Sequence, residues 1–176
     1  MAEYLRTYAL DLEKRVKSGE ITVIDRFKGE FAWLSNFYYY DTDVTVEHIF
    51  QASKVYRDAM YSEDMSWQAM ILQAETPGKA KELGRQAPLR KDWDKVRVRV
   101  MYEALLEKFD RPWLQEYLLA TGNIPLIEGN TWHDNFWGDC KCKKCDTLGH
   151  NHLGILLMRV RNELRAASEK LTEESS

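Results

Sequence analysis

The sequence has few of the features that membrane and disulfide-stabilised proteins depend on. Its 176 residues contain only three cysteines, and these lie within six positions, at Cys140, Cys142 and Cys145. Such a cluster cannot link distant parts of a chain, so it argues against a disulfide scaffold. No apolar run approaches the roughly 18–20 residues of a membrane-spanning helix, and the N-terminus lacks the order of a signal peptide. We therefore expect a cytoplasmic protein that has no membrane partner.

A strong positive charge is also absent. The chain carries 25 Lys+Arg against 28 Asp+Glu, which gives a net charge of −3 at pH 7. No global basic field therefore attracts duplex nucleic acid, although a local basic patch remains compatible with this balance. The length suits one domain that buries a substantial core, and no internal repeat is visible.

Aromatic and polar side chains concentrate in residues 130–139, which read Asn-Thr-Trp-His-Asp-Asn-Phe-Trp-Gly-Asp. Core segments are rich in Leu, Ile and Val, whereas this run has the composition of a pocket wall. Its rings can stack on a flat heterocycle or a ribose, while Asp134 supplies a negative charge beside them. The alternative is a surface loop that is held in place by buried aromatic rings.

Hydrophobic periodicity predicts an α+β fold that is predominantly helical, with a small antiparallel sheet. We expect a leading helix within residues 1–20 that packs on a domain of residues 21–168, followed by a frayed tail over 169–176. Strands are expected at 38–40 and 44–46. The helices inside the domain are expected at 46–57, 66–75, 76–84, 93–109, 112–121 and from Asn151 onward, with Ser66, Thr76, Asp92 and Asn151 as caps.

Two groups of polar residues are candidates for binding. Glu47, Gln51 and Lys54 are spaced so that an acid, an amide and an amine share one stripe of the helix over 46–57. The alternative is a solvated face whose first-turn glutamate complements the helix dipole. The second group is a basic segment that can hold a phosphate, or that forms an exposed helix face; it contains Arg85, Arg90, Lys91, Lys95, Arg97 and Arg99.

Several short segments occur in one order between about Phe27 and Leu164: 34–37, 46–54, 80–85, 89–93, Met101, 108–109, 134–139 and 149–161. In this order they resemble the NADAR domain, the family of YbiA-like N-glycosidases. Each segment alone is a weak signal, whereas the ordered set is specific. The residues before Ile21 lie outside the resemblance.

The resemblance implies a largely helical α+β fold and hydrolysis of an N-glycosidic bond, with no cofactor for catalysis and no obligate protein partner. The implied substrates are ribosylamino-pyrimidine phosphates of riboflavin synthesis, or ADP-ribose on guanine of a nucleotide or nucleic acid. The positions that match the catalytic set are Glu47, Trp93 and Asp134. Those that match substrate contacts are Ser35, Asn36, Lys54, Arg85, Trp137, Gly138 and Asn151.

The residue types fit this chemistry. Cleavage of a C–N glycosidic bond builds positive charge on the sugar, which a carboxylate stabilises, and a second group protonates the departing base. Glu47 or Asp134 takes the first role, and the sequence does not choose between them. One rival function is a module that binds ADP-ribose or NAD without cleaving it. Two carboxylates argue against that rival, because a phosphorylated ligand gains nothing from added negative charge.

The cysteines fall where many relatives have a short, glycine-rich link. Their C-x-C-x2-C spacing, followed by a histidine five residues later, supplies four candidate zinc ligands: Cys140, Cys142, Cys145 and His150. A closed site of this kind is structural. The alternative is three reduced thiols in a variable loop. A third possible function for the whole chain, a zinc-stabilised interaction domain, leaves the carboxylates and aromatic rings unexplained.

Overall fold

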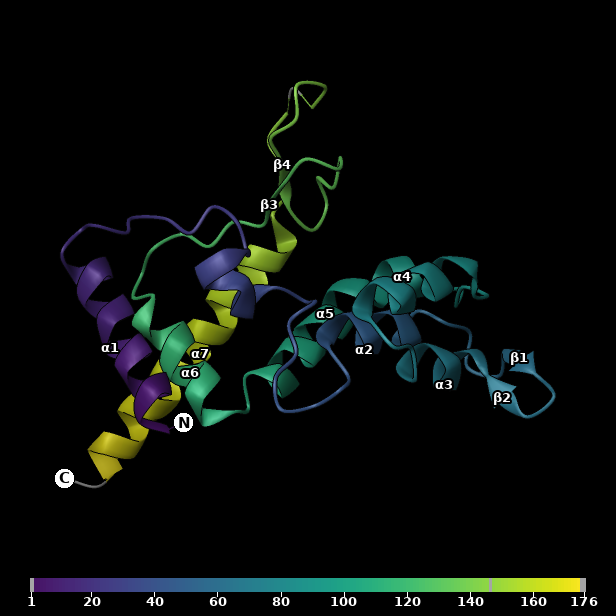
Figure 1. Cartoon of the computed structure of the whole chain (residues 1–176), viewed down its shortest axis with the longest axis horizontal. Helices are drawn as coiled ribbons and strands as arrows, with labels where there is room; N and C mark the ends of the chain where they lie inside the picture. Colours follow the sequence, from purple (N-terminus) through teal and green to yellow (C-terminus); the bar gives the residue numbers. More distant parts are fainter. Residues whose placement is uncertain (1, 146, 175–176) are drawn as a thin grey trace. The chain divides into compact units, whose positions relative to one another are not determined.

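The computed structural model describes residues 2–145 and 147–174, which form two compact units (Figure 1). Unit 1 comprises the chain up to Phe31 and from Lys108 onward, and unit 2 is Ala32–Glu107. The short 3-10 helix η1 (Gly29–Leu34) contains the first boundary between them. None of the described helices has the length and apolar composition needed to cross a membrane.

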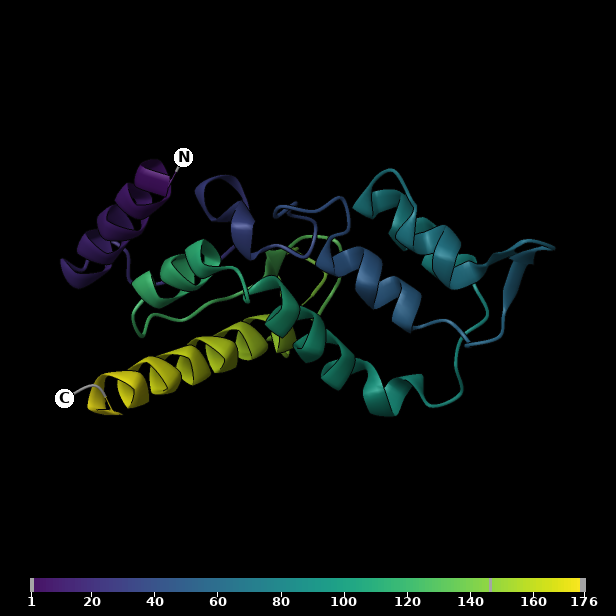
Figure 2. The ribbon, with the colours of Figure 1, turned by 90° about the horizontal axis from the view of Figure 1, so that it is seen from below.

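Three helices build unit 1: α1 (Ala2–Lys17), α6 (Pro112–Ala120) and α7 (His152–Glu174). Helix α6 packs against both α1 and α7, as Figure 2 shows. The rings of Tyr8 and Tyr117 meet at 4.4 Å between centroids, which joins the leading helix to α6. On the other side, buried Arg161 of α7 donates to Thr121 Oγ1 at 2.8 Å. These contacts join the three helices within unit 1.

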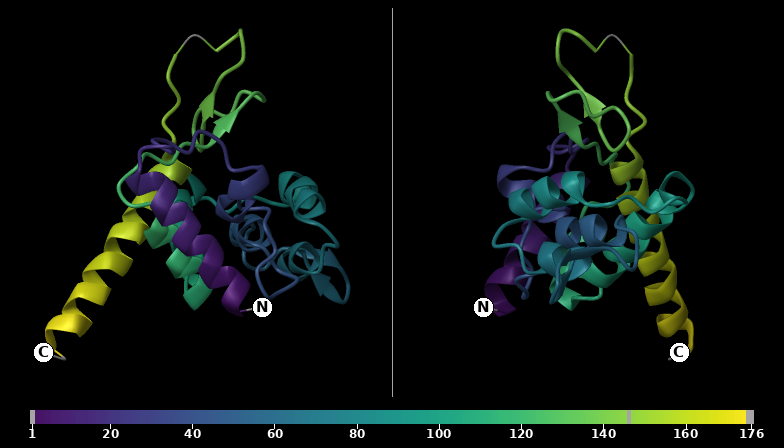
Figure 3. Two further views of the ribbon diagram at one scale, coloured as in Figure 1. Left: turned by 60° about the vertical axis from the view of Figure 1, so that its left-hand side comes forward. Right: turned by 90° about the vertical axis from the view of Figure 1, so that its right-hand side faces the viewer.

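A pair of short strands lies at the N-terminal end of α7 (Figure 3). Strand β3 (Gly129–Asn130) pairs in parallel with β4 (Asp139–Cys140). The aromatic loop, which we define as residues 130–138, begins at the last residue of β3 and ends before β4. The cysteine loop, which we define as residues 140–149, begins at the last residue of β4. The Gly149 N–H donates to Asp139 Oδ1 at 2.9 Å, so the cysteine loop is held at both of its ends.

Unit 2 contains four helices: α2 (Val46–Ser53), α3 (Trp67–Leu72), α4 (Pro77–Gln86) and α5 (Trp93–Lys108). Helices α2, α3 and α4 pack on one another around a small apolar core. Between α2 and α3, strands β1 (Met60–Ser62) and β2 (Met65–Ser66) form the antiparallel sheet. The predicted caps Ser66 and Thr76 are confirmed, since each hydroxyl oxygen accepts a hydrogen bond, from the N–H groups of Ala69 and Lys79 at 3.1 Å.

The structure differs from the sequence-based predictions in two strands and at the ends of two helices. Strands at 38–40 and 44–46 are wrong: the chain turns there, with φ of 61° at Asp41, and the sheet is formed by 60–66 instead. Helix α2 ends at Ser53 rather than near 57, because Val55 pairs with Leu89. Helix α7 extends to Glu174, so most of the segment expected as a tail is helical, and residues 175–176 lie outside the described residues.

Candidate functional site

Glu47 is a buried carboxylic acid in the first turn of α2. Its side chain is only 4% exposed, and its Oε1 accepts a hydrogen bond from Gln51 Nε2 at 2.8 Å. Burial raises the pKa of the Glu47 carboxyl, because it penalises the charged form. The positive charge of Lys81 and the hydrogen bond from Gln51 act in the opposite direction and are smaller. Glu47 therefore holds its proton more tightly than an exposed glutamate does.

Two cations of unit 2, Lys81 and Lys54, act on this carboxyl, and a third, Arg85, acts on Lys54. Lys54 caps the C-terminal end of α2, and burial, followed by the charge of Arg85, lowers its pKa, while Glu47 raises it. Lys81 also acts electrostatically on both Glu47 and Lys54. The Nζ of Lys81 lies 5.5 Å from the ring centroid of Phe37. Lys81 and Arg85 are one turn apart on α4 and thus share a face.

Close packing of α4 on α2 brings these charges together. A Cβ at Gly84 would lie 2.2 Å from Gln51 Oε1 and 2.9 Å from Gln51 Cβ, so only glycine permits this approach. Gly84, predicted as the end of a helix over 76–84, lies inside α4, which continues to Gln86. Sequence reasoning also missed Lys81. Its position four residues before Arg85 places both side chains on one face of α4, but this spacing does not show which helix that face meets.

Asn36 presents an unpartnered acceptor beside α2. The side chain is buried, and its Nδ2 donates to Met101 Sδ at 3.5 Å, while its backbone carbonyl accepts from the Glu47 N–H at 3.0 Å. Among the described residues, neither Asn36 Oδ1 nor Gln51 Oε1 has a hydrogen-bond partner, although both atoms are buried. Ser35 Oγ accepts from the Phe37 N–H at 3.2 Å, which shapes this turn. The two free acceptors suit a ligand that carries hydroxyl groups.

Trp93 begins α5 and is 8% exposed. Its ring meets that of Phe50 at 5.0 Å between centroids, with an interplanar angle of 57°. The Asp92 carboxylate, expected as a cap, instead binds Arg90, with 2.6 Å between Oδ1 and Nε. Most of Trp93 therefore belongs to the packing around α2, and only an edge is open.

Three of the six residues of the predicted basic segment form ion pairs within unit 2. Arg90 pairs with Asp92, Arg97 with Asp94 and Arg99 with Glu103. The alternative interpretation, an exposed helix face, describes Arg99, whereas Arg97 is half-buried on α5 and Arg90 is half-buried before that helix begins. Arg90 and Lys91 also line a separate pocket of about 580 Å³ that does not include Glu47. Within this segment, Arg85 is the residue that the structure associates with the Glu47 site.

Asp134 shapes the aromatic loop of unit 1. Its Oδ1 accepts from the backbone N–H groups of Phe136 at 3.1 Å and Trp137 at 2.8 Å. Asn130 supports the same turn, since its Nδ2 donates to the Asp134 carbonyl at 2.7 Å and its Oδ1 accepts from the Asp134 N–H at 3.2 Å. One carboxylate oxygen of Asp134 is thus engaged in the loop, and the other stays out of this network.

Carbonyl groups of the aromatic loop bind the start of α7. The N–H groups of His152 and Leu153 donate to the carbonyls of Phe136 and Trp137 at 3.2 and 3.0 Å. These carbonyls, rather than the Asn151 side chain, satisfy the first amides of the helix. Asn151 instead uses its Oδ1 to accept from the Glu128 N–H at 3.0 Å and its Nδ2 to donate to the Leu126 carbonyl at 2.9 Å. Its amide therefore has a structural role.

Gly138 and Trp137 differ in what they offer a ligand. A Cβ at Gly138 would lie 2.2 Å from the Glu128 carbonyl oxygen, so backbone packing explains the glycine. Trp137 is half-buried and meets Phe136 edge to face at 4.9 Å between centroids. Its exposed part keeps a ring surface available for stacking.

The predicted site residues fall into two sets. Ser35, Asn36, Glu47, Lys54, Arg85 and Trp93 belong to unit 2, and Asp134, Trp137, Gly138 and Asn151 belong to unit 1. Inside unit 2 the structure brings together the carboxyl, the cations and the free acceptors. Inside unit 1 it also groups the three cysteines with His133, whereas the ring of His150 stacks on His152 at 5.6 Å. His133 thus replaces His150 beside the thiols.

Comparisons with known proteins identify the family. A profile of the NADAR domain matches residues 26–165. An N-glycosidase of Nostoc punctiforme is 44% identical over 124 residues, which cover 69% of this chain and 74% of that protein. A riboflavin biosynthesis protein of Vibrio vulnificus is 38% identical over 137 residues, covering 76% of this chain but 35% of that protein.

A solved structure extends the likeness from sequence to fold. The N-glycosidase YbiA of Escherichia coli is 40% identical over 123 residues, 68% of this chain and 69% of that protein. The NMR structure of E. coli YbiA matches with a TM-score of 0.65 at 33% identity, covering 85% of this chain and 88% of that one. The predicted α+β, mainly helical fold is thereby confirmed. The chain belongs to the NADAR domain family.

Proposed function

We propose that this protein is an N-glycosidase that hydrolyses the bond between a phosphorylated ribose and a nitrogen base, with Glu47 at the reacting sugar. The observation that carries the proposal is the buried Glu47 carboxyl, whose pKa is raised by burial and on which the positive charges of Lys81 and Lys54 act. Arg85 in turn acts on Lys54. Membership of the family and the names of the N-glycosidase relatives support it. A merely solvated helix face does not bury its acid to 4% exposure.

Each group has a part in the reaction. The C–N bond breaks with its electron pair going to the base, which leaves positive charge on the anomeric carbon; water then adds there. A carboxyl whose pKa lies above its ordinary value is a better proton donor to the departing base, because more of it is protonated at a given pH, and its charged form stabilises the sugar cation. The amine and guanidinium groups of Lys54, Lys81 and Arg85 suit phosphate oxygens.

The free acceptors support a ribosyl substrate. Asn36 Oδ1 and Gln51 Oε1 are buried without hydrogen-bond partners among the described residues. Both residues are also hydrogen-bonded to Glu47: the Asn36 backbone carbonyl accepts from the Glu47 N–H, and Gln51 Nε2 donates to the Glu47 carboxyl. A buried acceptor without a donor costs about 1–3 kcal/mol. Ribose hydroxyls are donors of the right kind, and their binding beside Glu47 recovers that cost.

The positive charges of the site favour a phosphorylated substrate, but they do not identify the base that it carries. Three cations suit either a ribosylamino-pyrimidine phosphate or the diphosphate of ADP-ribose attached to guanine. Similarity to the Vibrio vulnificus riboflavin biosynthesis protein supports the first. The Glu47 carboxyl opposes a module that only binds ADP-ribose or NAD, because its charge repels the ligand's phosphates.

A substrate panel tests this function. Ribosylamino-pyrimidine phosphate, ADP-ribosylated guanosine, ADP-ribosylated DNA and NAD are incubated with the protein in ¹⁸O-labelled water. We expect release of a free base and one ¹⁸O atom on the anomeric carbon of the sugar product, both measured by mass spectrometry. Tight binding of ADP-ribose with no cleavage across the panel contradicts the proposal and favours the binding module.

Replacing Arg85 with alanine tests the phosphate role of the cations. We expect KM to rise more than kcat falls, because the interaction is made in the bound ground state as well. Loss of one charge-assisted contact is about 1.5–3 kcal/mol, or roughly 10- to 150-fold in kcat/KM. Steady-state kinetics on the panel substrate that turns over fastest provides the measurement.

Arg99→Ala is the matched control for Arg85→Ala. Arg99 is exposed on α5 and pairs with Glu103, so its removal changes the net charge equally without touching the Glu47 site. We expect near wild-type kinetics from this variant. An unchanged KM in Arg85→Ala, or an equal rise in Arg99→Ala, assigns Arg85 to the solvated surface.

A further inference from the structure

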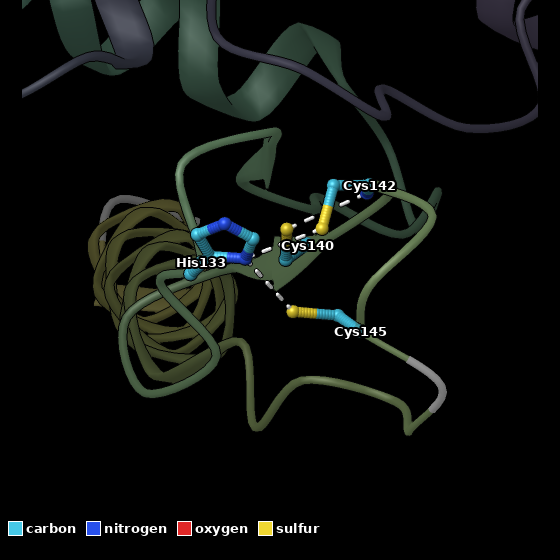
Figure 4. Close-up of side chains that lie close together, drawn as sticks. All are labelled: His133, Cys140, Cys142 and Cys145. Atoms are coloured by element: carbon cyan, nitrogen blue, oxygen red, sulfur yellow. Dashed lines mark hydrogen bonds between the residues drawn. The ribbon is translucent and has the colours of Figure 1, made fainter.

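Four side chains with metal-binding atoms converge between the aromatic loop and the cysteine loop of unit 1 (Figure 4). They are His133, Cys140, Cys142 and Cys145, and one ligand atom from each lies within 4.8 Å of all the others. The Nδ1 of His133 is 3.2 Å from Cys142 Sγ and 3.4 Å from Cys145 Sγ. All three cysteines are free thiols.

The size of this cluster fits a tetrahedral metal site. Zinc binds sulfur at about 2.3 Å and imidazole nitrogen at about 2.0–2.1 Å, so its ligand atoms lie about 3.5–3.8 Å from one another. The observed nitrogen-to-sulfur distances are close to this range. A disulfide would instead draw two sulfurs to about 2.05 Å.

Local structure holds each ligand in place. Cys140 ends strand β4, where its partner is Asn130. Cys142 and Cys145 flank a turn in which the Cys145 N–H donates to the Cys142 carbonyl at 3.3 Å, and the Cys142 N–H donates to Cys140 Sγ at 3.5 Å. Backbone N–H groups that donate to sulfur stabilise thiolates. The cluster is therefore built by three separate backbone constraints.

The backbone of His133 is bent toward the thiols. Its φ of 67° lies in the left-handed region, which is uncommon for a residue other than glycine. Such a conformation is retained where surrounding interactions determine it. In Figure 4 the imidazole extends from the aromatic loop toward the sulfurs of the cysteine loop. A bond from Nδ1 to a shared ion accounts for this orientation.

We propose that His133, Cys140, Cys142 and Cys145 bind one structural zinc ion. Four protein ligands complete a tetrahedron and leave no position for water or substrate, so the ion has a structural rather than a catalytic role. Binding releases the thiol protons, and three thiolates with Zn²⁺ leave a net charge of −1. The exposed side chains of Lys143 and Lys144, in the turn between two of the ligands, offset that charge.

The zinc ion ties the aromatic loop to the cysteine loop. His133 directly precedes Asp134, whose carboxylate shapes the turn that presents Trp137. The ion thus fixes one end of this turn, while the start of α7 fixes the other. This inference does not depend on the proposed reaction, because it rests on ligand geometry alone.

Metal content of the intact protein tests the site. The untagged chain is purified under reducing conditions, with zinc supplied and then removed by gel filtration, and is measured by elemental analysis. We expect about one zinc per chain in the wild type and in His150→Ala, and a large loss in His133→Ala and Cys145→Ser. Chelation should lower Tm in the first two proteins, since the ion binds the folded state.

Cobalt provides a readout that does not depend on how the variants fold. Wild-type protein stripped of metal is titrated with Co²⁺, and we expect thiolate-to-cobalt charge-transfer and tetrahedral ligand-field bands that saturate near one equivalent. Wild-type protein that binds neither zinc nor cobalt overturns the proposal. Equal metal loss in His150→Ala and His133→Ala overturns the ligand set. None of these measurements involves substrate, so they stand apart from any failure of the proposed reaction.

Discussion

Glu47→Gln is expected to abolish turnover and at the same time to stabilise the folded protein at neutral pH. Glutamine keeps the size of the side chain and the oxygen that accepts from Gln51 Nε2, but it neither carries charge nor exchanges a proton. Positioned acid–base groups contribute about 10²–10⁴-fold, or roughly 3–5 kcal/mol of barrier. We therefore expect kcat to fall at least about a hundredfold.

The gain in stability follows from the direction of the pKa shift. Burial raises the pKa of Glu47, so the folded state binds its proton more tightly than the unfolded state does. Stability contributed by this group is fully present below the unfolded pKa, about 4.3, and is lost as pH rises through the folded pKa. Glutamine is neutral throughout. The folded state of Glu47→Gln should thus be as stable as that of the wild type near pH 4 and more stable at higher pH.

Calorimetry at pH 4 and pH 8 measures this difference. Each pH unit by which the folded pKa exceeds the unfolded one corresponds to about 1.4 kcal/mol, and each kcal/mol to roughly 2–4 °C in Tm for a chain of this size. Glu116→Gln, at an exposed position on α6, is the control and should change neither kcat nor Tm. Wild-type turnover in Glu47→Gln removes Glu47 from the reaction. A Tm at pH 8 below that of the wild type contradicts the burial argument.

Helical spacing alone predicted the part of the Glu47 site that comes from α2 and the residue after it. The spacing of Glu47, Gln51 and Lys54 fixes an acid, an amide and an amine on one helix, and the structure keeps them there. The contribution of Lys81 was not predictable in this way. It depends on α4 approaching α2 at Gly84, and no periodicity within α4 reports where a neighbouring helix lies.

Tertiary contacts also explain the elements that sequence reasoning misplaced. The three tyrosines at 38–40 have high strand propensity. The segment nevertheless forms no strand, and Tyr40 is buried, with 1% of its surface exposed. Helix α2 has no local stop signal at Ser53. It ends because the Tyr56 N–H donates to the Pro88 carbonyl at 2.8 Å, a contact between segments more than thirty positions apart. Burial of one side chain overrides propensity in the first case, and backbone pairing between distant segments overrides it in the second.

The histidine that lies beside the thiols was also not predictable from local sequence spacing. Sequence spacing favoured His150, which follows the cysteines at a common ligand interval. His133 lies before them, and it reaches them because β3 pairs with β4 and because its own backbone adopts a positive φ. Neither feature is encoded in ligand spacing. A search for metal ligands from sequence should therefore extend in both directions from a cysteine cluster.

Two substitutions of Asp134, to asparagine and to alanine, distinguish a structural role of its carboxylate from a catalytic one. Its Oδ1 accepts two backbone N–H groups, from Phe136 and Trp137. Asparagine retains that oxygen, so Asp134→Asn should keep the loop and Tm while removing the charge. Alanine leaves both N–H groups without their acceptor, which costs about 1–3 kcal/mol where water does not replace it. Asp134→Ala should therefore lower Tm and increase hydrogen exchange in residues 134–138.

Turnover in the two variants then assigns the role of the carboxylate. If Asp134 stabilises charge or activates water, Asp134→Asn loses roughly a hundredfold in kcat at unchanged Tm. Asp110→Asn, at an exposed position, is the control for the loss of one negative charge. Wild-type kcat in Asp134→Asn together with a slow, destabilised Asp134→Ala makes Asp134 a loop-shaping residue and leaves Glu47 as the carboxyl of the reaction. Loss of turnover in both Glu47→Gln and Asp134→Asn instead means that neither carboxyl substitutes for the other, as expected when one stabilises the sugar cation and the other transfers a proton.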